Sequence, residues 1–253
     1  MRRAFTRAVS PRLAECQLTH IERLPIDAAK AASQHAVYEA ALEAAGFKVI
    51  RLPELPDDPD AVFVEDTAIL LDGHAVIARP GAASRAGETA STAAGLAGRF
   101  ELHCIERGFL DGGDVLRIGK RLYVGRSTRT DRDGIAALAE LIQPLGYDVV
   151  EAQLRECLHL KTGATFIGDD VLLYNERCVD PAQFAAKPLV VSPDEPAAAN
   201  CVRAGEHLIM PAGNPRTAAD LRNRGFNVLE VDVSELQKAE SGVTCMSLID
   251  SRD

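Results

Sequence analysis

The chain has 253 residues, of which 47% are hydrophobic and 26% charged, and its net charge is −9. This composition is typical of a globular protein, and an acidic balance without dense runs of Lys and Arg argues against nucleic acid and membrane as partners. No apolar run reaches the length of a transmembrane span, and the basic start MRRAFTRAVS lacks the apolar segment of a secretory signal. We therefore expect a cytoplasmic protein with reduced cysteines.

The predicted elements begin with a strand around residues 2–8, a helix over residues 27–45 and a strand after Gly46. Four strand–turn–strand segments follow, each with a glycine in its turn, which is the usual signal of a β-hairpin. The turn glycines are Gly73, Gly119, Gly168 and Gly205. Helices over residues 133–145 and 215–224 each end near a glycine that leads into an apolar strand, and a last strand is predicted around residues 244–249.

These elements repeat as a unit of hairpin, helix and strand. Four units are counted directly, and a fifth forms only if the last strand of the chain pairs with the first. Termini that complete one unit together indicate a closed ring, as in propellers, which protect their sheet edges. We therefore expect one α/β domain over residues 1–253, a fivefold pseudo-symmetric α/β-propeller of ββαβ-type units. A doubly wound sheet is the alternative, but hairpins inside every unit argue against it.

Two pairs of acidic residues stand in apolar surroundings. Glu65 and Asp66 lie in VFVEDTAILL at the start of a predicted strand, and Asp111 and Asp114 flank the glycines of FLDGGDVL. Charged side chains seldom enter such places unless they are paired. Either arginines of the protein itself satisfy them, or they form a pocket for a planar cation, because carboxylates bind guanidinium in a bidentate way.

Cys245, in the apolar strand predicted at GVTCMSL, and His159, in LHLKT, are each explained as buried structural residues when taken alone. Together with an acid they match the pattern of nucleophilic catalysis, in which histidine is the base and the acid orients it. Arg85 and Arg129 follow two hairpins at comparable places and form a candidate clamp for a carboxylate. Acids at one end of a pocket and arginines at the other suit an amino acid with a cationic side chain.

Several short motifs resemble one known family. FVEDTA, RPGAASR, LDGGDVL, RTDRDG, LHLKT and TCMSL, in this order between Phe5 and Ile249, closely resemble dimethylarginine dimethylaminohydrolases. This family belongs to the guanidine-modifying superfamily, which has the fivefold α/β-propeller (pentein) fold. The resemblance covers essentially the whole chain.

The resemblance implies that Cys245 is the nucleophile, His159 the general acid and base, and Asp111 the acid that orients His159. It also implies the substrate-binding residues: Glu65 and Asp66 for the guanidinium, Asp60 near the amino end, Arg85 and Arg129 for the α-carboxylate, and Leu18 in a flap over the substrate. The flap sequence PRLAECQLTHIERL is the least similar region.

The implied reaction is hydrolysis of asymmetric dimethylarginine or monomethylarginine to citrulline and an alkylamine, through a thiouronium intermediate on Cys245. It needs no cofactor and no metal, and the expected partner is a small cationic amino acid; a homodimer stays open. The alternatives are an arginine deiminase, another substituted-arginine hydrolase or an amidinotransferase. From other classes, a non-catalytic sensor of arginine-like ligands and a metal site of Cys157, His159 and Cys245 remain, although the sequence spacing of these residues is unlike that of zinc sites.

Overall fold

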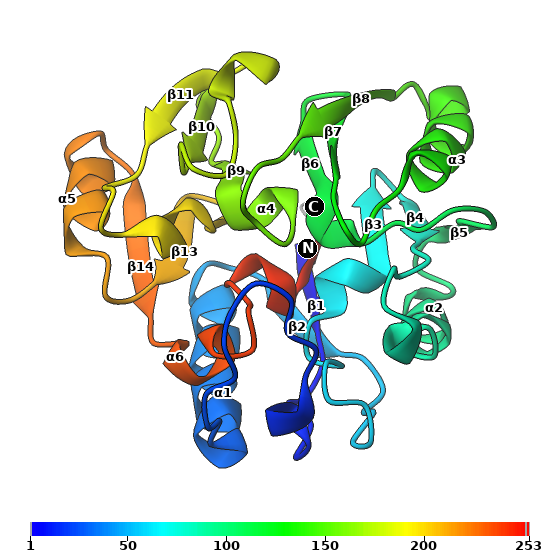
Figure 1. Ribbon diagram of the computed structural model, residues 1–253, viewed down its shortest axis with the longest axis horizontal. Coiled ribbons are helices and arrows are strands. Elements are labelled where there is room, and N and C mark those ends of the chain that lie inside the picture. Colours follow the sequence, from blue (N-terminus) through cyan, green and yellow to red (C-terminus); the bar gives the residue numbers. More distant parts are fainter. Residues whose placement is uncertain (1, 251, 253) are drawn as a thin grey trace.

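Five three-stranded sheets stand around a common centre in the computed structural model, which describes residues 2–250 and residue 252 (Figure 1). In every sheet the central strand is antiparallel to one neighbour and parallel to the other. The sheets are β15 (Leu248–Asp250), β1 (Arg3–Thr6) and β2 (Lys48–Arg51); β3 (Ala68–Leu71), β4 (His74–Ile77) and β5 (Glu101–Cys104); β6 (Val115–Ile118), β7 (Arg121–Arg126) and β8 (Asp148–Gln153); β9 (Ala164–Phe166), β10 (Val171–Tyr174) and β11 (Lys187–Val190); and β12 (Val202–Ala204), β13 (His207–Pro211) and β14 (Asn227–Val231).

Helices pack on the outside of this ring, and short helical turns lie nearer its centre (Figure 1). The α-helices are α1 (Ala28–Ala44), α2 (Glu88–Leu96), α3 (Arg132–Ile142), α4 (Leu160–Gly163), α5 (Pro215–Asn223) and α6 (Ser234–Gln237). None of the helices in the described part of the chain is long and apolar enough to cross a membrane.

The two ends of the chain close the ring, as predicted. In the first sheet, Ala4 of β1 pairs with Ile249 of β15 on one side and with Val49 of β2 on the other. Arg3 Nη2 and the buried carboxylate of Asp250 form an ion pair of 2.8 Å across the same join. The predicted fifth unit is thus confirmed, because neither terminal strand forms a complete sheet without the other.

The glycines predicted in the hairpin turns all have positive φ, between 59° and 104°. Most side chains avoid this left-handed region, which explains why glycine recurs at these turns. The glycines after α1 and α5 and at the end of the turn after α3 are left-handed as well. These local signals therefore placed the hairpins and the helix ends correctly.

One unit lacks the predicted helix. Between β10 and β11 the chain forms only a 3-10 turn, Pro181–Gln183, capped by Asp180 through the Ala182 N–H. Phe184 is already extended, and its ring packs against Tyr123 at a centroid distance of 5.0 Å. In the sheet of β9, β10 and β11, this aromatic pair therefore occupies the place where a helix was expected.

The apolar core is divided among the blades rather than gathered at the centre. One cluster joins β3 and β4 to β6, β7 and α3, and another joins β1 to β3, β4 and α2. Because these interfaces bury the apolar faces of neighbouring blades, the centre of the ring is left to polar residues. The candidate site is built there.

Candidate active site

A short helical turn precedes the first strand of each hairpin, and most of the predicted site residues lie on these turns. They are Glu65 and Asp66 in the turn Val64–Thr67, Asp111 just before the turn Gly112–Asp114, His159 just before α4, and Cys245 in the turn Thr244–Met246. The prediction of strands at Glu65, Asp66 and Cys245 is therefore wrong. A turn lets consecutive side chains point toward the centre, whereas a strand would send alternate ones to opposite faces.

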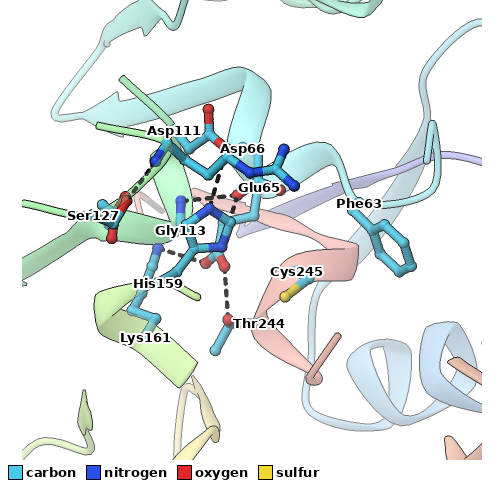
Figure 2. Close-up of polar contacts among 12 residues, drawn as sticks. Phe63, Glu65, Asp66, Asp111, Gly113, Ser127, His159, Lys161, Thr244 and Cys245 are labelled. Carbon is cyan, nitrogen blue, oxygen red and sulfur yellow. Dashed lines mark hydrogen bonds and ion pairs between the residues drawn. The ribbon is translucent and has the colours of Figure 1, made fainter. Parts of the chain in front are cut away.

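His159 is held in place by Asp111 (Figure 2). Its Nε2 lies 3.1 Å from Asp111 Oδ2, and the two residues are 6% and 0% exposed. Asp111 Oδ1 accepts a hydrogen bond of 2.9 Å from the Gly81 N–H. Burial by itself would lower the pKa of His159, but the negative charges of Asp66, Asp114 and Asp111 raise it to about 9. His159 is therefore an imidazolium at neutral pH.

Gly113 allows His159 and Asp66 to approach each other. Its N–H donates to Asp66 Oδ1 at 3.1 Å, and Asp66 Oδ1 lies 3.8 Å from His159 Nδ1. A Cβ atom on Gly113 would lie 2.7 Å from this oxygen and 2.8 Å from this nitrogen. Only glycine fits here without displacing one of the two side chains.

Cys245 lines the same pocket as His159 and Asp66 (Figure 2). Its Sγ accepts a hydrogen bond of 3.4 Å from the Gly242 N–H. Burial, followed by the negative charges of Glu65 and Asp66, raises the pKa of the thiol to about 12. The thiol therefore stays protonated near neutral pH unless positive charge is brought beside it.

Glu65 lies beneath the pocket rather than in its wall. Its Oε1 is 2.5 Å from Lys161 Nζ, and its Oε2 accepts a hydrogen bond of 2.7 Å from Thr244 Oγ1. Burial raises the pKa of this carboxyl group, and the Lys161 ammonium opposes the rise. Glu65, Lys161 and Thr244 all line a separate cavity of about 470 Å³ between the inner strands. They form the partition between that cavity and the pocket of Cys245.

Asp66 is paired with an arginine of the protein, which was the first of the two explanations for buried acids. Its Oδ2 lies 2.5 Å from Arg85 Nη1. Arg85 is 4% exposed and also donates to Glu88 at 3.0 and 2.8 Å and to the Phe63 carbonyl at 2.8 Å. Burial would raise the pKa of Asp66, but the positive charges of His159 and Arg85 lower it. Asp66 is thus a carboxylate that still faces the pocket.

Six of the predicted residues line one small pocket of about 30 Å³. They are Asp60, Asp66, Arg85, Arg129, His159 and Cys245. A pocket of this size is far too small for an amino acid, since ligand pockets are usually several hundred Å³. The pocket must therefore widen before a substrate of that size can bind in it.

The segment 17–20 borders the pocket through Gln17 and is bound to the loop that precedes Cys245. The N–H groups of Thr19 and His20 donate to the two carboxylate oxygens of Glu240 at 2.7 and 2.9 Å. Arg129 Nη2 donates to Thr19 Oγ1 at 3.1 Å. Glu240 has a φ of +57°, in the left-handed region where a residue other than glycine is uncommon. These contacts fasten the segment that was predicted to form the flap to the loop before Cys245.

Leu18 belongs to this flap but packs against the hydrophobic cluster that Cys245 also contacts, and it is not among the lining residues. Its neighbour Gln17 lines the pocket and donates its N–H to both oxygens of Asp60, at 3.2 and 3.1 Å. Burial raises the pKa of Asp60. The flap backbone, rather than the Leu18 side chain, therefore contacts the predicted amino-end residue.

Sequence reasoning missed Lys161, Glu240 and Asn200. Asn200 Oδ1 accepts from the Thr244 N–H at 2.9 Å, and its Nδ2 donates to Thr244 Oγ1 at 3.0 Å and to the Lys161 carbonyl at 2.8 Å. It thereby fixes the turn that carries Cys245. Lys161 stands two residues after His159 in LHLKT, and Asn200 stands just before an apolar strand, so their positions gave some signal. Their partners, however, are far away in the sequence.

Cys157 takes no part in the pocket. It lies in a hydrophobic cluster with Cys178, and a hydrogen bond between the two thiols, together with burial, raises the pKa of Cys157. Ligand atoms of Asp66, Asp111 and His159 do lie within 4.8 Å of one another. The protein's own hydrogen-bond donors already occupy both carboxylates, which accounts for this cluster without an ion.

The fold and the site together define a class of protein. A fivefold propeller whose central pocket contains a cysteine, an acid-bound histidine and a buried carboxylate corresponds to the guanidine-modifying superfamily that the sequence motifs resemble. The family model of arginine deiminase matches residues 54–204, which is more than half of the chain.

The chain belongs to the dimethylarginine dimethylaminohydrolase family. It is 38% identical over 252 residues to N(G),N(G)-dimethylarginine dimethylaminohydrolase of Streptomyces coelicolor, covering 98% of this chain and 96% of that protein. It is 38% identical over 229 residues to the Pseudomonas aeruginosa protein of the same name, covering 88% and 89%. The solved structure of a cysteine-to-serine mutant of the Pseudomonas aeruginosa protein, complexed with citrulline, is similar over 99% of this chain and 100% of that chain, with a TM-score of 0.93 and 34% identity. The predicted propeller fold is thereby confirmed.

Proposed function

We propose that this protein hydrolyses Nω-methylated arginine, either asymmetric dimethylarginine or monomethylarginine, to citrulline and an alkylamine. The observation that carries the proposal is that Cys245, His159 and Asp66 line one small pocket, in a chain of this family. A nucleophile, a proton donor and a carboxylate for the substrate cation are the groups that the reaction requires.

The charges of the site favour a cationic substrate. Burial and the carboxylates of Glu65 and Asp66 keep the Cys245 thiol protonated, with a pKa of about 12. A guanidinium bound beside these carboxylates offsets their charge and lowers the pKa of the thiol. The nucleophile is then activated mainly when its substrate is present.

In the proposed first step the Cys245 thiol, whose pKa the bound cation lowers, releases its proton to solvent, and the thiolate attacks the guanidinium carbon. The carbon–nitrogen bond to the methylated nitrogen breaks, and His159, which is protonated at neutral pH, donates a proton to the departing amine. A positively charged thiouronium group remains on Cys245. Asp66 stabilises that charge, so a carboxylate replaces the hydrogen-bond donors that acyl transfer would require.

In the proposed second step, His159 has lost its proton and accepts one from a water molecule. The resulting hydroxide attacks the thiouronium carbon and the carbon–sulfur bond breaks. The hydroxyl proton passes to the departing Cys245 sulfur, which is again a thiol, and neutral citrulline leaves. Asp111 keeps the ring of His159 in one orientation through both steps, because its carboxylate is itself held by the Gly81 N–H. In total, one water is consumed and one amine is released.

The other end of the substrate is assigned to the flap side of the pocket. Arg129 is half-buried there and donates a hydrogen bond to the neutral hydroxyl of Thr19, so its charge is assigned to the α-carboxylate. The charge of Arg85 is already balanced by Asp66 and Glu88, and it contributes mainly by shaping the pocket wall. Asp60 is assigned to the amino group.

We also propose that the chain folds as a single domain, since the pairing of β1 with β15 ties its two ends together. The six cysteines are all free, which supports a cytoplasmic location. The proposed binding partner is the small cationic amino acid.

Product analysis tests the function. The purified protein is given asymmetric dimethylarginine, monomethylarginine and arginine separately, and citrulline, dimethylamine, methylamine and ammonia are measured, with Cys245→Ser as the inactive control. Citrulline with an equal amount of dimethylamine from the dimethylated substrate is the expected result. Citrulline with ammonia from arginine alone would instead assign the activity of an arginine deiminase, which the matching family model keeps as the second candidate.

A further inference from the structure

Two histidines and a glutamate face one another on the second blade, outside the active site. His74 begins β4 and Glu101 begins the parallel strand β5, and the register pairs His74 with Glu101 and Val76 with His103. Since alternate residues of a strand point to the same face, Glu101 and His103 lie on one face of β5. β5 is the outer strand of its sheet (Figure 1), so the cluster stands at an edge that solvent reaches.

The potential ligand atoms of the three side chains converge on one point. His74 Nδ1 lies 3.1 Å from His103 Nε2 and 3.5 Å from Glu101 Oε2, and the second carboxylate oxygen lies 3.9 Å from His103 Nε2. A tetrahedral zinc ion with bonds of about 2.0–2.1 Å sets its ligand atoms roughly 3.3 Å apart. The cluster matches this spacing with only small adjustments of its side chains.

Hydrogen bonding explains only part of this arrangement. Two neutral imidazoles share a single N–H between His74 and His103, so one facing nitrogen keeps its lone pair. The carboxylate contacts of 3.5 and 3.9 Å are too long for good hydrogen bonds. A dication at the centre would bind both nitrogen lone pairs and the carboxylate at once.

We propose that His74, Glu101 and His103 bind a zinc ion, with water as the fourth ligand. Two imidazoles and one carboxylate are a common ligand set of zinc, and they disfavour calcium and magnesium, which prefer oxygen ligands. The side chains of His74 and His103 are 25% and 20% exposed, so the ion reaches the site without local unfolding and leaves one coordination position open to water.

The site would join two strands that are separated by the whole segment containing α2. His74 and His103 are 29 residues apart, which is why the sequence shows no zinc motif there. An ion that binds only the folded protein stabilises it by mass action. At zinc about a hundred times above its dissociation constant, the expected rise in Tm is about 5 to 10 °C for a chain of this size.

The test measures zinc binding and Tm on chelator-treated full-length protein in a Cys245→Ser background, so that the active-site thiol cannot supply a ligand. Calorimetric titration with zinc chloride is expected to give one ion per chain with micromolar affinity. Adding His103→Ala or Glu101→Gln is expected to weaken this binding at least tenfold and to remove the zinc-dependent rise in Tm. The matched control is Glu106→Gln, a change of an exposed glutamate two residues beyond β5 that should leave zinc binding intact.

Cobalt gives a second readout, because its visible spectrum reports tetrahedral nitrogen and oxygen coordination directly. The His74→Asn change is expected to remove the tetrahedral cobalt spectrum and to leave the circular dichroism spectrum unchanged. When the same change is made in the protein that retains Cys245, hydrolysis is expected to stay unchanged. Together these results support the site. Equal zinc stoichiometry and affinity in the parent and in His103→Ala would overturn it. Neither outcome depends on the proposed hydrolysis, which is assayed separately with and without a chelator.

Discussion

Replacing Asp111 with asparagine tests how the protein sets the charge of His159. The pKa of His159 is raised from 6.5 to about 9, which corresponds to roughly 3 kcal/mol in favour of the imidazolium. A hydrogen bond between a charged pair contributes about 1.5–3 kcal/mol. The asparagine side chain keeps the shape of the aspartate but not its charge, so the pKa of His159 should fall by about one to two pH units.

The proposed mechanism predicts the direction in which this change shifts the pH dependence of kcat. His159 must be protonated to donate to the leaving amine, so kcat falls as pH rises through its pKa. In Asp111→Asn that alkaline fall should begin about one to two pH units lower, and the maximal kcat should drop about 10²- to 10⁴-fold. Citrulline release is followed from pH 6 to pH 10, with Asp111→Glu as the control that keeps a carboxylate. An alkaline limb at the same pH in both variants would refute the assigned role of Asp111.

Cys245→Ser should abolish citrulline release while leaving the circular dichroism spectrum unchanged, and retained turnover would contradict the nucleophile assignment. Lys161→Met should reduce the free energy of unfolding by about 3–5 kcal/mol, because it leaves the buried Glu65 carboxylate unpaired. Urea titration measures this, and the double change with Glu65→Gln should recover part of the loss; if it recovers none, the pair is not the cause. Glu240→Gln should raise KM several-fold with little change in kcat, because the flap loses the charge that holds its N–H groups. Unchanged steady-state kinetics in Glu240→Gln would show that the hydrogen bonds between Glu240 and the flap do not limit substrate binding.

Much of the fold could be predicted because its signals are local. Glycine at a hairpin turn marks the one conformation that other residues avoid, and every predicted turn glycine has the expected positive φ. The helix that ends before Gly46 and the strand after it follow from the same kind of signal. Counting these units predicted the ring and its closure by β1 and β15.

The sequence was less informative where packing between distant segments overrides local preference. No local pattern announces that Phe184 packs on Tyr123 in place of a helix. An apolar stretch such as GVTCMSL fits a strand, yet Asn200 holds Thr244 by two hydrogen bonds and bends the chain into a turn at Cys245. The distinction depends on a side chain more than forty residues away, as the separation of 44 shows.

For the site, the types of residue could be predicted from the sequence, but the residues with which they form ion pairs and hydrogen bonds could not. Buried acids in apolar sequence indicate that cations lie nearby, but only the folded chain decides that Lys161 meets Glu65 across 96 residues and Arg85 meets Asp66. The same holds for the flap, whose N–H groups reach Glu240 across more than 200 residues. Sequence determined the repeat and the ring, because these depend on local conformation, and it named the candidate reactive residues from their motifs. Tertiary structure decided which charges neutralise one another, because electrostatic pairing depends on distance in space rather than along the chain.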